Sequence, residues 1–199
     1  MSGGGLACGA VLVDDSGATV AEGRNRAYDP GGGSDILKLT PIAHAEMNVL
    51  AAVPTERELS KSTLWSSQEP CSMCTAAAAF AGIGTVRYLA PDPWGVTAQH
   101  GRSRKGMDAM PLPEPLRIIG PFEDHHWVAA ATVLFLVSIA RSGGVEHPTI
   151  VRSFELDPST TALVRRIIET GATVNLPASA TDFLAPLWSQ IATAVSAKD

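Results

Sequence analysis

Residues 62–90, "STLWSSQEPCSMCTAAAAFAGIGTVRYLA", contain the strand–helix–strand pattern that decides the fold. The run 62–67 predicts a short strand, and the alanine-rich run 71–81 predicts a helix that ends at Gly82. Residues 85–90 predict the next strand, which "PDPWG" ends. Because one helix joins these two strands, we expect them to be parallel neighbours in one sheet.

The residues before this unit predict a hairpin and a second helix. Residues 10–22 favour two strands joined by a tight turn at 14–17, so the sheet should be mixed. The loop 25–40 contains three consecutive glycines and is long enough to be a binding loop. Residues 42–53 then favour a helix, which Pro54 ends.

The organisation changes after Pro121. One more short strand is expected at 116–120, within a proline-rich stretch. Beyond it the sequence predicts three helices, at about 123–141, 159–170 and 180–197. No cluster of ligand-type residues lies in these helices, so we expect them to serve packing.

Composition excludes some classes of protein. The chain has 199 residues, a formal net charge of -5 and a hydrophobic fraction of 45%, which are typical of a compact globular protein. The negative charge argues against a protein that neutralises many phosphates of a long nucleic acid. We therefore expect a small-molecule substrate and no nucleic acid. The most basic stretch, 101–106, predicts a solvated loop.

Nothing in the sequence predicts a membrane role. The longest apolar run, 127–140, is 14 residues long, too short to span a membrane and typical of a buried helix. The N-terminus lacks the charged and apolar regions of a secretory signal. The three cysteines do not form the even-numbered framework of a small secreted protein. These features predict a cytoplasmic protein.

His44, Cys71 and Cys74 are candidate metal ligands. Imidazole and thiolate suit zinc, and three protein ligands leave one position for water, as in catalytic rather than structural zinc sites. Cys71 and Cys74 fall in the first turn of a predicted helix, where the helix dipole stabilises a thiolate. Cys8 is a possible fourth ligand, although its position at the first strand favours a small buried residue.

Glu46 follows His44 by two positions, a spacing that needs an irregular start to the helix. On a regular helix two such residues point about 200° apart. If both face one cavity, Glu46 can take a proton from zinc-bound water, whose pKa zinc lowers towards ~7, and pass it to the substrate. Taken separately, the CxxC also fits a redox dithiol and His44 a helix cap. Together with Pro70 and the element order, they favour a zinc site.

The motifs "HAE" at 44–46 and "PCSMC" at 70–74 resemble the signature of the zinc-dependent cytidine deaminase-like superfamily. The resemblance covers about residues 9–95. Within the superfamily, "EPCSMC" and "EGRNR" are most similar to the guanine deaminase and tRNA adenosine deaminase branch. The resemblance implies Zn²⁺ as cofactor and a hydrolytic deaminase activity.

The same resemblance implies the architecture. It is an α/β fold of three α-β-α layers with a mixed central sheet. Residues 1–121 would form the catalytic domain, and residues 122–199 a helical C-terminal extension packed on it. Family members commonly begin with an additional helix, and here the hairpin starts almost at Met1. We expect the helix at 123–141 to cover the sheet face that the missing helix would occupy.

The resemblance also implies the roles of particular residues. His44, Cys71 and Cys74 would hold zinc, and Glu46 would be the catalytic proton carrier. The implied substrate contacts are Asn25, Ala45, Pro70, Asp92 and Trp94. Judged from the residues alone, Asn25 and Asp92 also fit turn positions.

Several functions are therefore open. The first is removal of an exocyclic amine from a nucleobase or related heterocycle, guanine-like by branch, with release of ammonia. The second is a nucleoside, nucleotide or tRNA deaminase of the cytidine, dCMP or tRNA adenosine type. The third, of another class, is a non-catalytic zinc module that binds a partner. The family resemblance also implies a homodimer.

Overall fold

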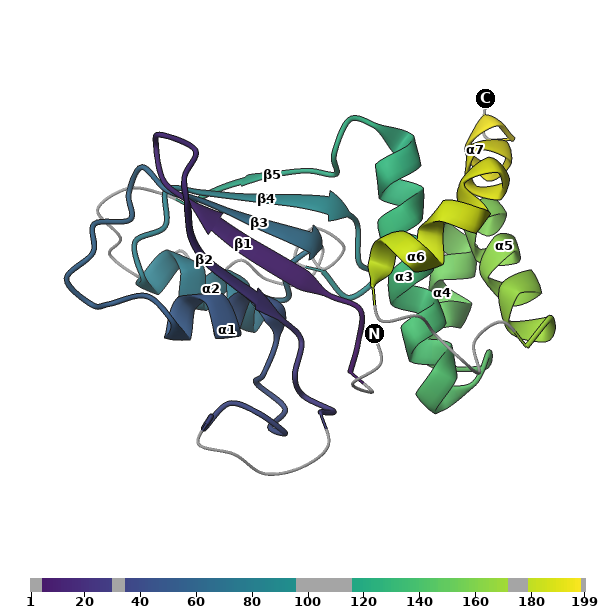
Figure 1. Cartoon of the computed structure of the whole chain (residues 1–199), viewed down its shortest axis with the longest axis horizontal. Helices are drawn as coiled ribbons and strands as arrows, with labels where there is room; N and C mark the ends of the chain where they lie inside the picture. Colours follow the sequence, from purple (N-terminus) through teal and green to yellow (C-terminus); the bar gives the residue numbers. More distant parts are fainter. Residues whose placement is uncertain (1–4, 30–34, 96–115, 172–178, 198–199) are drawn as a thin grey trace.

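The computed structural model describes residues 5–29, 35–95, 116–171 and 179–197 (Figure 1). They form a five-stranded sheet in the order β2-β1-β3-β4-β5. β1 pairs antiparallel with both neighbours, whereas β3, β4 and β5 are parallel, so the predicted mixed sheet is confirmed. The strands are β1 (Gly9–Val13), β2 (Thr19–Arg24), β3 (Thr63–Gln68), β4 (Thr85–Ala90) and β5 (Arg117–Ile119). The basic stretch 101–106 lies outside the described residues.

Two short helices cover one face of the sheet. α1 (Ala45–Ala51) follows the loop after β2, and α2 (Ser72–Phe80) joins β3 to β4 as predicted. In Figure 1 both helices lie beneath the strands. Leu12 and Leu64 point to this side and are fully buried, in a cluster that includes residues of both helices. The cluster fixes the ends of α1 and α2 against the sheet.

Gly23 in β2 lets α1 lie close to the sheet. A Cβ atom there would be 2.8 Å from the Ala45 carbonyl oxygen and 3.0 Å from the Val49 backbone nitrogen. We predict that Gly23→Ala lowers the free energy of unfolding by about 1–3 kcal/mol, because α1 must shift to relieve the overlap. Urea denaturation measures the change. Gly9→Ala is the control, since its added Cβ would meet nothing closer than 3.9 Å; equal losses would contradict the prediction.

The C-terminal part is helical, as expected, but its described residues form five α-helices where the sequence predicts three, because α4 is additional and the helix expected at 180–197 is divided into two. The helices are α3 (His125–Gly143), α4 (Pro148–Leu156), α5 (Pro158–Glu169), α6 (Ala180–Leu184) and α7 (Trp188–Ser196), with a 3₁₀ turn between α6 and α7. α4 escaped prediction because Pro148 looks like a break, whereas it occupies the first turn of the helix after the N-cap His147. The buried face of α4 also carries two polar residues, Thr149 and Ser153, which hides its apolar pattern.

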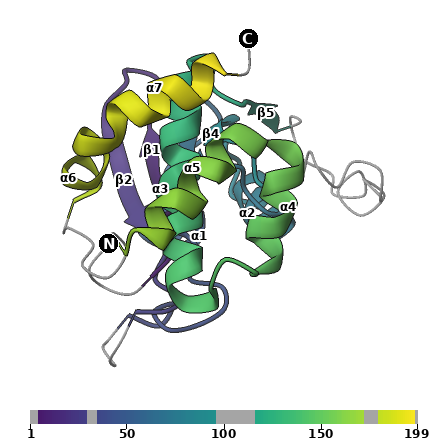
Figure 2. The same cartoon turned by 90° about the vertical axis from the view of Figure 1, so that its right-hand side faces the viewer.

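The C-terminal helices form their own hydrophobic cluster around α3. Val133, Val137, Ile150, Leu163 and Ile191 are completely buried in it. Figure 2 shows α3, α4 and α5 gathered in front of the sheet when the molecule is viewed from this end. Among the described residues, no helix has both the length and the apolar character needed to cross a membrane.

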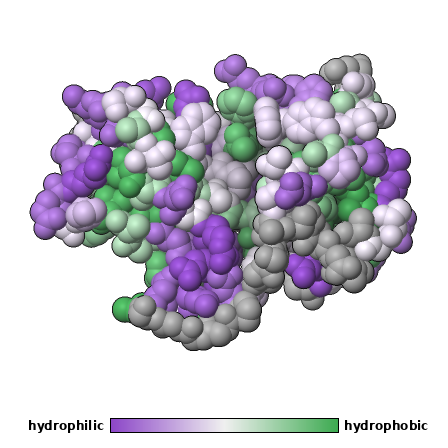
Figure 3. Space-filling model, in the orientation of Figure 1, coloured by the Kyte–Doolittle hydropathy of each residue, from purple (hydrophilic) through white to green (hydrophobic). Residues whose placement is uncertain are grey.

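The expectation that residues 123–141 cover the second face of the sheet is wrong. α3 stands at the arrowhead ends of β3 and β4, and no helix of the described residues lies along the face opposite α1 and α2 (Figure 1). Side chains on that face, such as Val11 and Trp65, are only half-buried, and hydrophobic residues are visible over the strands in Figure 3. The Gln68 side chain donates to the Ala131 carbonyl, which ties α3 to the strand end.

Candidate metal centre and active site

His44, Cys71 and Cys74 form one compact cluster, as the sequence predicts. The Sγ atom of Cys71 is 3.6 Å from His44 Nδ1 and 3.6 Å from Cys74 Sγ, and Cys74 Sγ is also 3.6 Å from His44 Nδ1. Among the described residues, these three are the group of His, Cys, Asp and Glu side chains able to hold a metal ion. Cys8 is not part of the group, so the cluster has three ligands.

The backbone explains how these ligands converge. His44 and Cys71 are the N-cap residues of α1 and α2, and both are extended, with ψ of 161° and 170°. An extended N-cap directs its side chain differently from the helical residues that follow. His44 and Glu46 can therefore face one cavity, which confirms the irregular helix start expected from their spacing.

Without a metal ion, the pKa values of the two thiols shift in opposite directions. The hydrogen bond between the two thiols lowers the pKa of Cys71 to about 4, despite the opposing effect of burial, and the nearby His44 also lowers it. The same hydrogen bond and burial raise the pKa of Cys74. The hydrogen bond with Cys71 raises the pKa of His44. A second thiolate beside the first needs a cation to stabilise it.

The geometry fits zinc. Bond lengths of about 2.0–2.3 Å at tetrahedral angles separate the ligand atoms of zinc by roughly 3.6 Å, which is the spacing found here for all three pairs. One nitrogen and two sulfur ligands also match the preference of zinc. Because the cluster has three members, a fourth position is left for water or substrate.

Glu46 lies beside the cluster and is held by a neighbouring strand. Its side chain is buried, and its Oε1 atom accepts a hydrogen bond of 2.7 Å from the Ser66 hydroxyl in β3. Glu46 also contributes to the raised pKa of Cys74, so its charge acts directly on the metal ligands. A carboxylate fixed next to an open metal position is suited to proton transfer.

A small cavity of about 90 Å³ opens onto this cluster. Three of the predicted substrate contacts, Asn25, Ala45 and Asp92, line it. Asn25 is buried, and its Oδ1 atom accepts a hydrogen bond from the Ala27 N–H, so it is also a turn residue. Burial raises the pKa of Asp92 to about 6, although the Trp94 N–H donates to this carboxylate and opposes the shift.

The other two predicted contacts, Pro70 and Trp94, are not among the residues that line the cavity. Pro70 is buried between Glu69 and Cys71. The indole N–H of Trp94 donates a 3.1 Å hydrogen bond to Thr149 in α4, and the Arg152 guanidinium lies over its ring. Trp94 thus links the loop that carries Asp92 to the C-terminal helices.

Five further residues line the cavity, and of these the sequence offers only Cys8 as a candidate, for a fourth metal ligand. Gln68 and Glu69 come from the end of β3, Leu6 and Cys8 from the segment before β1, and Phe135 from α3. Glu69 adjoins the PCxxC motif and was noted only as a mark of the family branch. Nothing in the sequence places Leu6 or Phe135 at the cavity, because both belong to ordinary apolar stretches.

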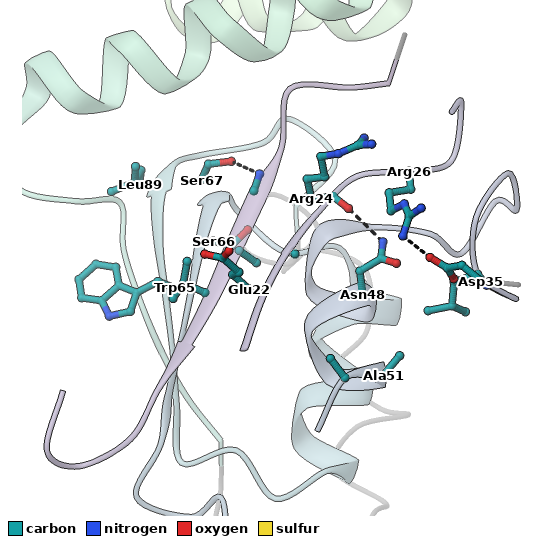
Figure 4. A pocket seen from close by; sticks show the side chains of 16 residues that line it. Glu22, Arg24, Arg26, Asp35, Asn48, Ala51, Trp65, Ser66, Ser67 and Leu89 are labelled. Atoms are coloured by element: carbon teal, nitrogen blue, oxygen red, sulfur yellow. Dashed lines mark hydrogen bonds and ion pairs between the residues drawn. The ribbon is translucent and has the colours of Figure 1, made fainter. Parts of the chain in front are cut away.

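A larger cavity of about 900 Å³ lies between β1, β2, β3 and α1 (Figure 4). It contains none of the metal ligands. Three of its charged side chains form ion pairs: Arg26 pairs with Asp35, and Arg24 forms a 2.6 Å ion pair with Asp29. The Asn48 amide donates to the Arg24 carbonyl. These contacts fix the loop after β2, and the candidate chemistry remains at the smaller cavity.

Comparison with known proteins gives one family. The model of the cytidine and deoxycytidylate deaminase zinc-binding region matches residues 3–90. A probable cytosine deaminase of Schizosaccharomyces pombe is 33% identical over 76 residues, which are 38% of this chain and 41% of that protein. A tRNA-specific adenosine deaminase of Agrobacterium fabrum is 38% identical over 97 residues, 47% of this chain and 57% of that protein. The chain spans about half the length of these curated relatives.

A solved structure of guanine deaminase from Nitrosomonas europaea superposes with a TM-score of 0.43 and 21% identity, over 67% of this chain and 72% of that chain. His44, Glu46, Cys71 and Cys74 all fall inside the region matched by the family model. The donor set and its spacing agree with that match, so Zn²⁺ is the cofactor of this site. α3 and the helices after it lie beyond the matched region.

Proposed function

We propose a hydrolytic deaminase activity for this chain and its membership of the zinc-dependent cytidine deaminase-like superfamily, on the match of residues 3–90 to the zinc-binding region model. The substrate would be a nucleobase or a related aminated heterocycle, and the products its oxo form and ammonia. The observation that carries this proposal is the buried Glu46 carboxylate, which lines the same cavity as His44 and Cys71 of the three-membered metal cluster. A structural zinc site with four protein ligands needs neither an open fourth position nor a carboxylate beside the metal.

The proposed chemistry follows from the positions of these side chains. His44, Cys71 and Cys74 would hold zinc, which when bound lowers the pKa of water and so favours its attack. Glu46 takes one proton from the attacking water and delivers it to the ring nitrogen next to the amine-bearing carbon. A carbon–oxygen bond forms and the carbon–nitrogen bond breaks. The second proton of the water leaves with the amine as ammonia.

Ser66 would position Glu46 for this transfer. Its hydroxyl donates to Oε1, which fixes the orientation of the carboxylate without competing for protons from the substrate side. Asn25 and the Ala45 backbone, both at the cavity, would orient the ring. Pro70 and Trp94 would act on the substrate indirectly, because they support the adjacent ligands and loop.

Guanine is the first substrate to test. Glu46, Glu69 and Asp92 place three carboxyl groups around one small cavity, and carboxylates accept hydrogen bonds from N–H groups. Guanine presents a ring N–H and an amino group along one edge, whereas cytosine presents mainly acceptors there. A donor-rich edge therefore matches the cavity better.

Two other functions are weaker. A tRNA substrate is opposed by the net charge of -5, because tRNA binding needs basic surface to neutralise phosphates. A zinc module without catalysis would not require a buried carboxylate next to the metal ligands. Nucleosides and nucleotides of the cytidine type remain the alternative substrates for the same hydrolytic reaction.

The test is an ammonia-release assay on guanine, adenine, cytosine, their nucleosides and aminated triazines, with zinc content measured in the same samples. Release from at least one of them in proportion to zinc content supports the proposal. A preparation with one zinc per chain and no activity on any of them would contradict it and favour the interaction module.

We also propose that residues 1–121 are the catalytic domain and residues 122–199 a helical extension packed on it. The two hydrophobic clusters support this division. Leu6 and Cys8 pack against the cluster of the extension, and Cys8 packs against both. The extension should therefore be inseparable from the catalytic part.

A homodimer is the proposed assembly, formed through α2. Ala76 and Ala77 are half-buried, and the Phe80 side chain of this helix is 81% exposed. An exposed aromatic residue next to small residues allows close contact with a second copy. Phe80→Glu is expected to give monomers in sedimentation velocity, whereas Ile36→Glu, at another exposed apolar residue, should leave dimers. Unchanged dimers in Phe80→Glu would exclude this surface.

A further inference from the structure

Two large apolar residues line the small cavity, and one of them, Phe135, lies outside the region that matches the family model. Phe135 belongs to α3, and it is 7% exposed. Leu6 lies before β1 and packs against the same hydrophobic cluster as Phe135. Both line the cavity, whose other lining residues include metal ligands, carboxylates and amides. α3 thus supplies a wall of the candidate active site.

This wall is anchored at several points. The Ser138 hydroxyl accepts a 2.9 Å hydrogen bond from the Ala7 N–H and donates a 2.6 Å bond to the Phe135 carbonyl. The Gln68 amide donates a 3.0 Å bond to the Ala131 carbonyl. These bonds join α3 to the segment that carries Leu6 and to the end of β3. Moving Phe135 outwards would break them or disturb the core around α3.

The volume of the cavity limits what it can hold. Pockets for drug-sized ligands usually enclose about 300–1,000 Å³, whereas this cavity encloses about 90 Å³. A planar heterocycle is the class of ligand that such a narrow space accommodates. A ribose attached to the ring would need additional room. The cavity is bounded by Phe135, Leu6 and buried polar residues, which leave no such room.

We infer that Phe135 and Leu6 set the size limit of the substrate and restrict it to free bases without a sugar. The inference rests on the proposed function and adds the substrate class to it. Phe135 is a specificity-determining residue that contacts the ring face or edge and takes no part in proton transfer. Its removal should open the cavity towards the C-terminal helices.

The test compares guanine with guanosine, and cytosine with cytidine, in the zinc-loaded full chain. Wild type should prefer the free base. Phe135→Ala and Leu6→Ala should each reduce the ratio of kcat/KM for base over nucleoside by about tenfold or more, as removal of apolar wall atoms relaxes a size limit. Phe135→Leu, which keeps an apolar side chain, is the matched control and should retain most of the preference.

Binding provides a readout that does not depend on turnover. In Glu46→Gln protein, guanosine should bind much more weakly than guanine by calorimetry, and adding Phe135→Ala should reduce the difference. If the protein with intact Phe135 has equal kcat/KM for base and nucleoside, or binds them equally, the size limit is wrong. The proposed function would not be affected by that result. Full zinc with no deamination of any substrate would overturn the proposed function, and the binding comparison would still decide the size limit. Zinc content and melting temperature identify variants that fail to fold, and Leu6→Ala leaves α3 intact.

Discussion

Glu46→Gln is expected to retain zinc and to lose ammonia release by about 10²–10⁴-fold in kcat, the usual contribution of a positioned general acid–base group. Glutamine has nearly the same shape and can still accept the hydrogen bond that Ser66 donates to Glu46, so the fold and the metal cluster should remain. It cannot carry a proton between water and substrate. Steady-state assays at saturating substrate measure kcat, and metal analysis of the same samples measures zinc.

Glu22→Gln is the matched control for this experiment. Glu22 lies in β2 and is exposed, so the same chemical change occurs away from the cluster and should leave kcat within about twofold, the usual scale for surface substitutions. If Glu46→Gln keeps wild-type activity, another group carries the proton. If Glu46→Gln loses zinc together with activity, the carboxylate serves the metal site rather than proton transfer.

The sequence predicts the part of this molecule that depends on local patterns. The strand–helix–strand unit around Cys71 and Cys74, the hairpin before it and the converging ligands all appear in the structure. Strand alternation and a glycine after the helix are local properties. The meeting of His44 with the two cysteines is not local, because they cap different helices, and it is the resemblance to the family signature that implies it. Glu46 follows from the same stretch as His44.

The wall of the cavity is not local. Phe135 and Leu6 reach it only because α3 crosses the ends of β3 and β4, and that position depends on bonds such as Gln68 to the Ala131 carbonyl. Phe135 is an apolar residue in an apolar helix, and nothing in the sequence indicates that it lines a cavity. The same reason accounts for the error over α3, whose long apolar face fits a sheet face and a strand end equally well.

Cys74→Ala is expected to remove zinc and to lower the melting temperature of the preparation. Structural zinc sites with four ligands contribute about 10–16 kcal/mol at pH 7; one ligand of such a set is therefore worth roughly 3 kcal/mol, or about 10²-fold in affinity. The lost ion also leaves Cys71 and His44 without the contact that joins the starts of α2 and α1. Metal analysis after dialysis measures the loss. A chelator should lower the melting temperature of wild type and leave that of Cys74→Ala unchanged.

Cys8→Ala is the matched control, because it removes a cysteine at the same cavity. Cys8 lines that cavity but is absent from the metal cluster, so its replacement removes a nearby thiol without removing a ligand. It should keep one zinc per chain and the wild-type response to chelator. If Cys8→Ala instead loses zinc as Cys74→Ala does, the ion has four protein ligands. A site closed in that way has no position for water, and the deaminase proposal would fail together with the three-ligand assignment, even though the fold and the match of residues 3–90 to the family model would stand.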